Sequence, residues 1–128
     1  DVVLATLRAA GVTSVADLGC GEGKLLRRLL VDPQFRRIAG MDVSAASLAI
    51  TSERLSRSRF ADAARERLSL LHGSLLYRDS RLAGYEAAAL VEVIEHLDPP
   101  RLTACERVVF GAMAPRVVVV TTPNQEYN

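Results

Sequence analysis

The sequence predicts an α/β fold in which a mostly parallel β-sheet is doubly wound, with helices on both of its faces. Apolar segments of strand length alternate along the chain with segments of helical spacing. A glycine-rich turn at residues 17–23 joins the first of these strands to a helix, and the run Val117 to Val120 predicts a strand at the centre of the sheet. The 128 residues, 49% of them hydrophobic, are expected to form one domain spanning residues 1–128.

The first part of the chain predicts a helix, a strand and a second helix. Residues 2–10 have helical spacing and are followed by Gly11, a common residue at helix C-termini. Residues 12–18 are apolar and lead into the glycine turn, as expected of a buried strand. Residues 24–30 again have helical spacing, and Asp32 and Pro33 end this helix because the residue before a proline disfavours helical geometry.

The middle of the chain repeats this order. Residues 38–43 predict a second strand, and Ser44 is a suitable N-cap for a helix over residues 45–58. Residues 68–71 predict a short third strand. The alternation of strand and helix implies right-handed crossovers between parallel strands.

The last part of the chain predicts a fourth strand at residues 85–93, a helix at 99–113 and a fifth strand at 116–122. The two prolines that begin the helix are tolerated in a first turn. An open sheet that stopped there would leave a valine-rich strand at its edge, where it invites aggregation. We therefore expect the domain to be truncated, with C-terminal strands missing after Asn128.

The glycine turn predicts a nucleoside cofactor site. Gly19, Gly21 and Gly23 lie between a buried strand and a helix, where glycine allows a sharp turn and close approach of a ligand. Their spacing, G-x-G-x-G after Asp17, differs from the G-x-G-x-x-G of dinucleotide sites, which hold a pyrophosphate. S-adenosylmethionine carries no phosphate, and its cationic amino-acid end suits an acidic neighbour such as Asp17.

Further cofactor-binding residues are predicted after the next two strands. Asp42 ends the second strand, where a carboxylate accepts hydrogen bonds from ribose hydroxyls. Ser74 and Leu75 follow the third strand and are expected beside the adenine. With residues 17–23 and 40–44 in this order, the chain resembles the class I S-adenosylmethionine-dependent methyltransferases, which have a Rossmann-like fold. This resemblance implies S-adenosylmethionine as cofactor and leaves the substrate open.

A candidate metal site follows the fourth strand. Glu92, Glu95 and His96 stand at positions i, i+3 and i+4, so a helical turn there would place all three on one face. Two carboxylates and an imidazole suit Mg²⁺ or Mn²⁺ better than Zn²⁺. A cation beside the cofactor would lower the pKa of an acceptor hydroxyl. The alternative is that these residues only cap a helix or line the pocket.

The segments at residues 71–79, 91–98 and 121–128 carry a narrower resemblance. They look like the 3′-terminal RNA ribose 2′-O-methyltransferases that act on small RNAs, and most closely like the bacterial branch. The resemblance implies that Glu92, Glu95 and His96 bind a divalent metal, which takes the 2′- and 3′-hydroxyls of the last nucleotide. It also implies a further histidine ligand after Asn128, an RNA 3′ end as substrate, and an RNA kinase-phosphatase-ligase as a repair partner.

The tail contains three candidate substrate residues, Asn124, Glu126 and Tyr127, which follow the fifth strand. The tyrosine is placed to stack on the terminal base and the amide to bind ribose or phosphate. The alternative is that the segment only shapes a turn. All basic residues except Lys24 are arginine, a bias that suits RNA but is equally typical of solvated helix faces.

Two other functions remain open at this stage. One is a small-molecule O-methyltransferase of the quinone-biosynthesis type, whose fourth strand also ends in a Glu-x-x-Glu-His pattern. The other is a non-catalytic scaffold that binds the cofactor. The two cysteines, without a C-x-x-C motif, suit a reducing cytoplasm, and no apolar run reaches the roughly 20 residues that cross a bilayer, so no membrane association is expected.

Overall fold

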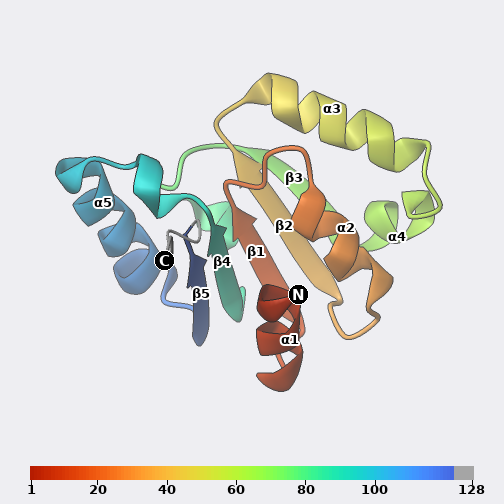
Figure 1. Ribbon diagram of the computed structural model, residues 1–128, viewed down its shortest axis with the longest axis horizontal. Coiled ribbons are helices and arrows are strands. Elements are labelled where there is room, and N and C mark those ends of the chain that lie inside the picture. The colour runs from red at the N-terminus through yellow and green to blue at the C-terminus, as the bar shows by residue number, and fades with distance from the viewer. Residues whose placement is uncertain (123–128) are drawn as a thin grey trace, which may run out of the picture.

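Five parallel strands form a single sheet in the computed structural model, which describes residues 1–122. Their order across the sheet is β3-β2-β1-β4-β5, so the chain winds outward from the central β1 in both directions (Figure 1). This confirms the predicted doubly wound α/β fold. The strands are β1 (Ser14–Leu18), β2 (Arg37–Asp42), β3 (Leu68–His72), β4 (Ala87–Val91) and β5 (Val117–Thr121).

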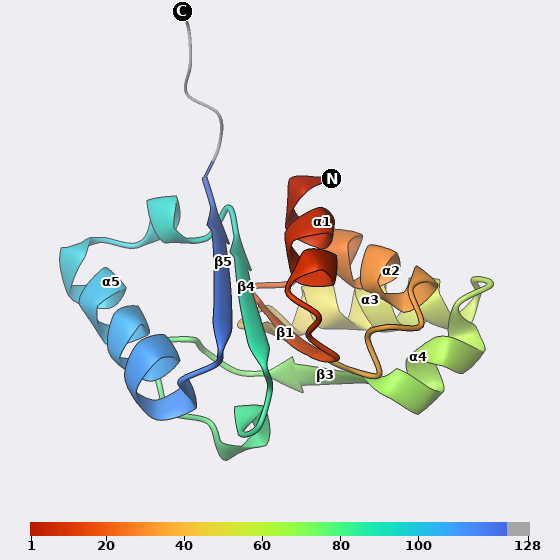
Figure 2. The same cartoon turned by 90° about the horizontal axis from the view of Figure 1, so that it is seen from below.

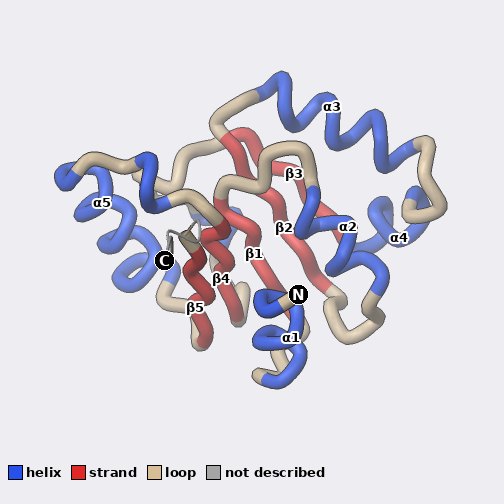
Figure 3. The backbone as a smooth tube through the Cα atoms, in the orientation of Figure 1, coloured by secondary structure: helices blue, strands red, loops and turns tan. Residues whose placement is uncertain are grey.

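Helices cover both faces of the sheet. Figure 3 shows the sheet between them, and Figure 2 places α1 and α2 on one side of it and α5 on the other. Each face packs its own cluster of buried apolar side chains, one beneath α1 and α2 and the other beneath α5 and η3. The helices are α1 (Val2–Ala9), α2 (Lys24–Val31), α3 (Ala45–Ser56), α4 (Ala61–Arg67) and α5 (Pro99–Glu106), with short 3₁₀ turns η1 (Ser80–Leu82) and η2 (Ile94–His96) and a π-helical segment η3 (Arg107–Met113).

Helix starts follow the capping chemistry that the sequence indicates. Ser44 is the N-cap of α3, and its hydroxyl accepts a hydrogen bond from the Ser47 N–H at 3.1 Å. Asp98 caps α5 in the same way by accepting from the Arg101 N–H at 3.0 Å. Prolines occupy the first two positions of α5, where they remove no intrahelical bond.

Three elements differ from the sequence-based prediction. Helix α4 was not predicted, because it buries none of its residues and so has no apolar periodicity. The fourth strand is shorter than residues 85–93, since Glu92 leaves the sheet with a left-handed backbone. The helix expected over residues 99–113 is α-helical only to Glu106 and continues as η3.

The valine run forms the outermost strand of the described sheet. Within residues 1–122, β5 pairs with β4 alone, which is the edge position expected where no later strand is described. Val120 is 44% exposed accordingly. β-Branched residues favour any strand, so the run predicts a strand without fixing its place in the sheet. None of the helices described within residues 1–122 is both long enough and apolar enough to cross a membrane.

Small residues at the centre of the sheet let the helices pack closely against it. Gly40 of β2 is the tightest such position, because a Cβ there would lie 2.7 Å from Cδ1 of Leu26 and 3.1 Å from Sγ of Cys20. Leu26 is completely buried, so its Cδ1 would have to shift within a packed core to admit a Cβ at position 40. Glycine at this position therefore lets α2 pack closely against the sheet.

We predict that Gly40→Ala destabilises the protein by about 1–3 kcal/mol through overpacking. Gly111→Ala is the matched control, because Gly111 lies in helical η3 and a Cβ added to it would meet no atom within 4 Å. That change is expected to be neutral or mildly stabilising. Urea denaturation of both variants measures the difference, and equal unfolding midpoints would contradict the packing argument.

Candidate active site

The carboxyl ends of the parallel strands bring the predicted site residues to one edge of the sheet. The glycine turn follows β1, the start of α3 follows β2, and η2 follows β4 (Figure 1). The switch in winding direction falls between β1 and β4, which is where ligands bind in open α/β sheets. The arrangement brings the segments that carry the predicted cofactor residues and the predicted metal ligands to the same edge.

The backbone of the glycine turn requires glycine. Gly19, Gly21 and Gly23 have φ angles of 87°, 54° and 88°, which L-residues with side chains rarely adopt. Space is restricted as well, because a Cβ at Gly19 would lie 2.9 Å from Cγ2 of Val93. A Cβ at Gly23 would lie 2.9 Å from Cγ2 of Thr51. The turn thus presents bare backbone where it meets α3 and the segment after β4.

The turn is held in place by the end of β2. The Asp42 carboxylate accepts hydrogen bonds from the Gly21 N–H at 2.8 Å and from the Ser44 N–H at 2.9 Å. The Met41 carbonyl accepts two more, from the N–H groups of Gly19 at 2.7 Å and Cys20 at 2.9 Å. Each carboxylate oxygen keeps a second lone pair, so Asp42 retains acceptor capacity for ribose hydroxyls.

Thr51 supports the turn from α3, a role that was not predicted from the sequence. Its side chain is completely buried, and its hydroxyl donates a hydrogen bond to the Gly21 carbonyl at 3.1 Å. Gly21 is therefore held through its N–H by Asp42 and through its carbonyl by Thr51. A threonine inside a predicted helix gives no sign of such a role, because only the fold brings α3 against the turn.

Asp17 is a buried acid at the end of β1. It is 2% exposed, and burial raises its pKa to about 7, with the negative charge of Asp42 adding to the effect. Burial likewise raises the pKa of the Cys20 thiol to about 12, so this cysteine is an unreactive packing residue at neutral pH. A cationic ligand group beside Asp17 would relieve the cost of its charge.

Two adjoining cavities open at this edge and share Gly19 and Glu92. One, of about 360 Å³, contains Asp17. The other, of about 570 Å³, contains Asp42, Ser74 and Leu75, the residues predicted at the ribose and adenine. Both volumes are in the range of small-molecule sites. The additional lining residues are, in the first, Asp1, Val3, Cys20, Lys24, Leu25, Arg28 and Val91 and, in the second, Met41, Val43, Gly73, Leu76, Val93, His96, Leu97 and Arg101.

Glu92 does not begin a helical turn, so the prediction of one turn from Glu92 to His96 is wrong. Glu92 has φ 54°, and its N–H donates to the Thr121 carbonyl at 2.9 Å, while η2 begins only at Ile94. A non-glycine residue in this region costs about 1–2 kcal/mol. Such strain is typical of functional sites, where the surrounding structure holds it in place.

The three predicted metal ligands are only partly brought together. Glu92 and His96 line the same cavity, and Nε2 of His96 lies 3.8 Å from Oε2 of Glu95. Within residues 1–122, no three His, Cys, Asp or Glu side chains gather closely enough to hold a metal ion. The donor types nevertheless suit a hard divalent cation. The predicted substrate residues Asn124, Glu126 and Tyr127 lie outside the described residues.

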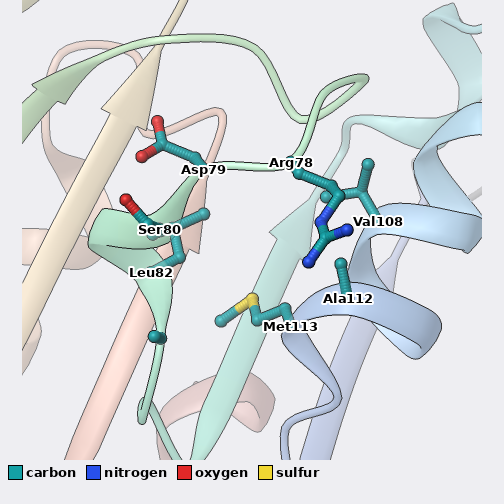
Figure 4. A pocket seen from close by; sticks show the side chains of 8 residues that line it. Arg78, Asp79, Ser80, Leu82, Val108, Ala112 and Met113 are labelled. Atoms are coloured by element: carbon teal, nitrogen blue, oxygen red, sulfur yellow. The ribbon is translucent and has the colours of Figure 1, made fainter.

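A further cavity, of about 460 Å³, lies away from this edge, between the β3–β4 connection and η3. Figure 4 shows the Arg78 side chain extending toward Ala112. Leu82 and Ala83 precede β4, and Met113 precedes β5, so this cavity lies toward the amino ends of those strands. None of the predicted cofactor or metal residues lines it.

Comparison with known proteins identifies relatives of the whole fold. The family described as "methyltransferase domain" matches residues 16–119. A small RNA 2′-O-methyltransferase of Rattus norvegicus is 40% identical over 121 residues, which cover 89% of this chain and 30% of the relative. The chain thus spans less than a third of that protein's length.

Two solved structures are similar in both sequence and fold. The methyltransferase domain of bacterial CtHen1 is 49% identical with a TM-score of 0.91, and the match covers 99% of this chain and 66% of that one. The small RNA methyltransferase HEN1 is 29% identical with a TM-score of 0.82, over 96% of this chain and 16% of that one. These matches confirm the resemblance drawn from the sequence.

We predict that Asp17 makes the stability of the protein pH-dependent. The folded state keeps the Asp17 proton up to about pH 7, whereas the unfolded state loses it near the ordinary pKa of 3.8. The folded state therefore binds more protons in this window, and the free energy of unfolding falls as pH rises through it. Asp17→Asn removes the titration, so its stability relative to the parent should rise by roughly 2–4 kcal/mol between pH 4 and pH 7.5. Parallel stability curves for the two proteins would refute this.

Proposed function

This chain belongs to the methyltransferase domain family, and we propose that it transfers a methyl group from S-adenosylmethionine to the 2′-hydroxyl of the 3′-terminal nucleotide of RNA. The observation that carries the proposal is a single cavity lined by both Asp42 and the pair Glu92 and His96. Predicted cofactor residues and two of the predicted metal ligands thus line one space. The RNA substrate is supported by the similarity to small RNA 2′-O-methyltransferases.

The cofactor would lie across the two adjoining cavities. Its adenosine would occupy the larger one, with its ribose hydroxyls donating to Asp42 and its adenine beside Ser74 and Leu75. Its amino-acid end would enter the smaller one, where Asp17 offers a carboxylate to the ammonium group. Gly19 belongs to both cavities and has no side chain to obstruct the passage between them.

Methyl transfer needs the acceptor oxygen in line with the bond between sulfur and the methyl carbon. The new oxygen–carbon bond forms as the carbon–sulfur bond breaks, and the hydroxyl proton leaves to a base. Glu92 and His96 line this cavity, and a cation held by them would favour loss of that proton by lowering the pKa of the hydroxyl. A donor bound in the same cavity would make the reaction effectively intramolecular.

Glu92, Glu95 and His96 would hold Mg²⁺ or Mn²⁺. When bound, such a cation lowers the pKa of a ribose hydroxyl and orients its oxygen. Two of the three side chains line the cavity, and the third, Glu95, lies beside His96. The resemblance to bacterial end-modifying enzymes further supports a cytoplasmic role in RNA repair, beside a kinase-phosphatase-ligase.

Two alternatives make different predictions. A small-molecule methyltransferase of the quinone-biosynthesis type would use the same cofactor and ignore RNA. A non-catalytic scaffold would bind the cofactor without turnover, and it is favoured by the lack of a three-ligand cluster within the described part of the chain. Substrate chemistry at the RNA end separates the proposed function from both alternatives.

We predict that an RNA ending in a 2′,3′-diol is methylated, whereas RNAs ending in a 2′-deoxyribose or a 3′-phosphate are not. The first control lacks the acceptor oxygen and the second lacks the neighbouring hydroxyl. Methyl transfer from labelled S-adenosylmethionine measures the difference. Equal labelling of the diol and the 3′-phosphate would exclude recognition of the end. Indifference to all RNA would favour the small-molecule enzyme or the scaffold.

We also predict that Glu95→Gln weakens metal activation without weakening cofactor binding. Glu95 lines neither cofactor cavity, so the Kd for S-adenosylmethionine should be unchanged. The Mn²⁺ concentration for half-maximal activity should rise about 10- to 100-fold, as losses around metal sites usually do. Glu106→Gln, on exposed surface of α5, is the matched control. An unchanged Mn²⁺ requirement in Glu95→Gln would remove Glu95 from the site.

A further inference from the structure

We propose that Arg101 binds the last internucleotide phosphate of the RNA and thereby seats the terminal ribose in the cavity. The inference rests on the proposed function and adds a substrate-binding residue to it. Arg101 lies on α5, in the first turn after Asp98, and its side chain lines the same cavity as Glu92 and His96. It therefore approaches the cavity from α5, whereas Glu92 and His96 lie in the segment after β4.

A positive side chain at the cavity would offset the negative charge of its lining. Its described lining includes two carboxylates, Asp42 and Glu92, which repel an incoming phosphodiester. Arg101 is the one lysine or arginine among those lining residues. A guanidinium is always charged and matches two phosphate oxygens with two parallel N–H groups. Arg101 can therefore offset the repulsion where the RNA end enters.

The backbone of α5 offers little to an anion, which leaves the task to the side chain. Pro99 and Pro100 occupy the first two helical positions and have no N–H groups. The N–H of Arg101 is already bonded to the Asp98 carboxylate, and that of Leu102 to the Asp98 carbonyl. The usual anion-binding donors of a helix N-terminus are thus missing or occupied.

The guanidinium of Arg101 is held loosely. Its nearest carboxylate oxygen, on Asp98, is 3.7 Å away, which is too long for a hydrogen bond. Arg8 and Asp32 form a contact of 2.6 Å by comparison, and Arg54 and Glu22 one of 2.9 Å. The Arg101 side chain is 63% exposed. Its donors are therefore available to a ligand at little cost in broken interactions.

The test combines Arg101→Ala with an RNA diol whose last internucleotide linkage is a neutral methylphosphonate. With ordinary RNA, Arg101→Ala should raise KM about tenfold and leave kcat and the Kd for S-adenosylmethionine nearly unchanged. The slope of log affinity against log salt should fall by about 1. With the neutral linkage, the KM of the parent protein should rise by a similar factor, whereas the KM of Arg101→Ala should not rise further.

Controls identify both the residue and the phosphate. Arg107→Ala removes an exposed arginine that does not line the cavity and should behave as the parent. Arg101→Lys keeps the charge without the fork and should restore part of the affinity. A methylphosphonate placed three linkages inward should change KM by the same factor in Arg101→Ala and in the parent protein.

Two results would overturn the inference alone, and a third would overturn the proposed function on which it rests. An unchanged KM in Arg101→Ala, or equal sensitivity of both proteins to the neutral last linkage, would show that Arg101 does not contact that phosphate. Failure of the parent protein to methylate any RNA diol would instead overturn the proposed function, and the inference with it. Because the parent is assayed first, the two failures are distinguished.

Discussion

The hydrogen bonds between Asp42 and the glycine turn are the constraint on which the rest of the site depends. One carboxylate holds the Gly21 N–H and the Ser44 N–H, and so fixes the turn after β1 and the entry into α3 together. Thr51 completes the arrangement by binding the Gly21 carbonyl from α3. This backbone is therefore held by contacts within the chain itself, so a ligand that bound there would incur a lower ordering cost.

Two residues of the site, Asp17 and Glu92, are in conformations or environments that lower the stability of the fold. Asp17 is buried without a cation beside it among the described residues, and its pKa is raised to about 7 by burial and by Asp42. Glu92 is held in a left-handed conformation by its hydrogen bond to Thr121. Both features are unfavourable in isolation and lie on the walls of the two adjoining cavities. Backbone strain and a raised pKa at cavity walls are typical of ligand-binding sites.

Much of the fold was predictable because its elements leave local marks. The apolar strands, the glycine turn and the cap at Ser44 depend on near neighbours in sequence. Helix α4 buries none of its residues and so leaves no apolar pattern in the sequence. The support from Thr51 depends on contacts between distant segments, which no local pattern predicts. The prediction of a helical turn at Glu92 was wrong because the backbone there is held by a hydrogen bond to Thr121 of β5, a residue distant in sequence.

The central claim is that donor and acceptor groups share one cavity at the carboxyl ends of β1, β2 and β4. The most direct test is nuclear magnetic resonance of S-adenosylmethionine carrying a ¹³C-labelled methyl group, bound to the protein and titrated with paramagnetic Mn²⁺. We predict that Mn²⁺ strongly broadens the methyl resonance in the parent protein. In Glu92→Gln the cofactor should still bind, but its methyl resonance should no longer be broadened. A methyl resonance that stays sharp while both Mn²⁺ and cofactor are bound would contradict it.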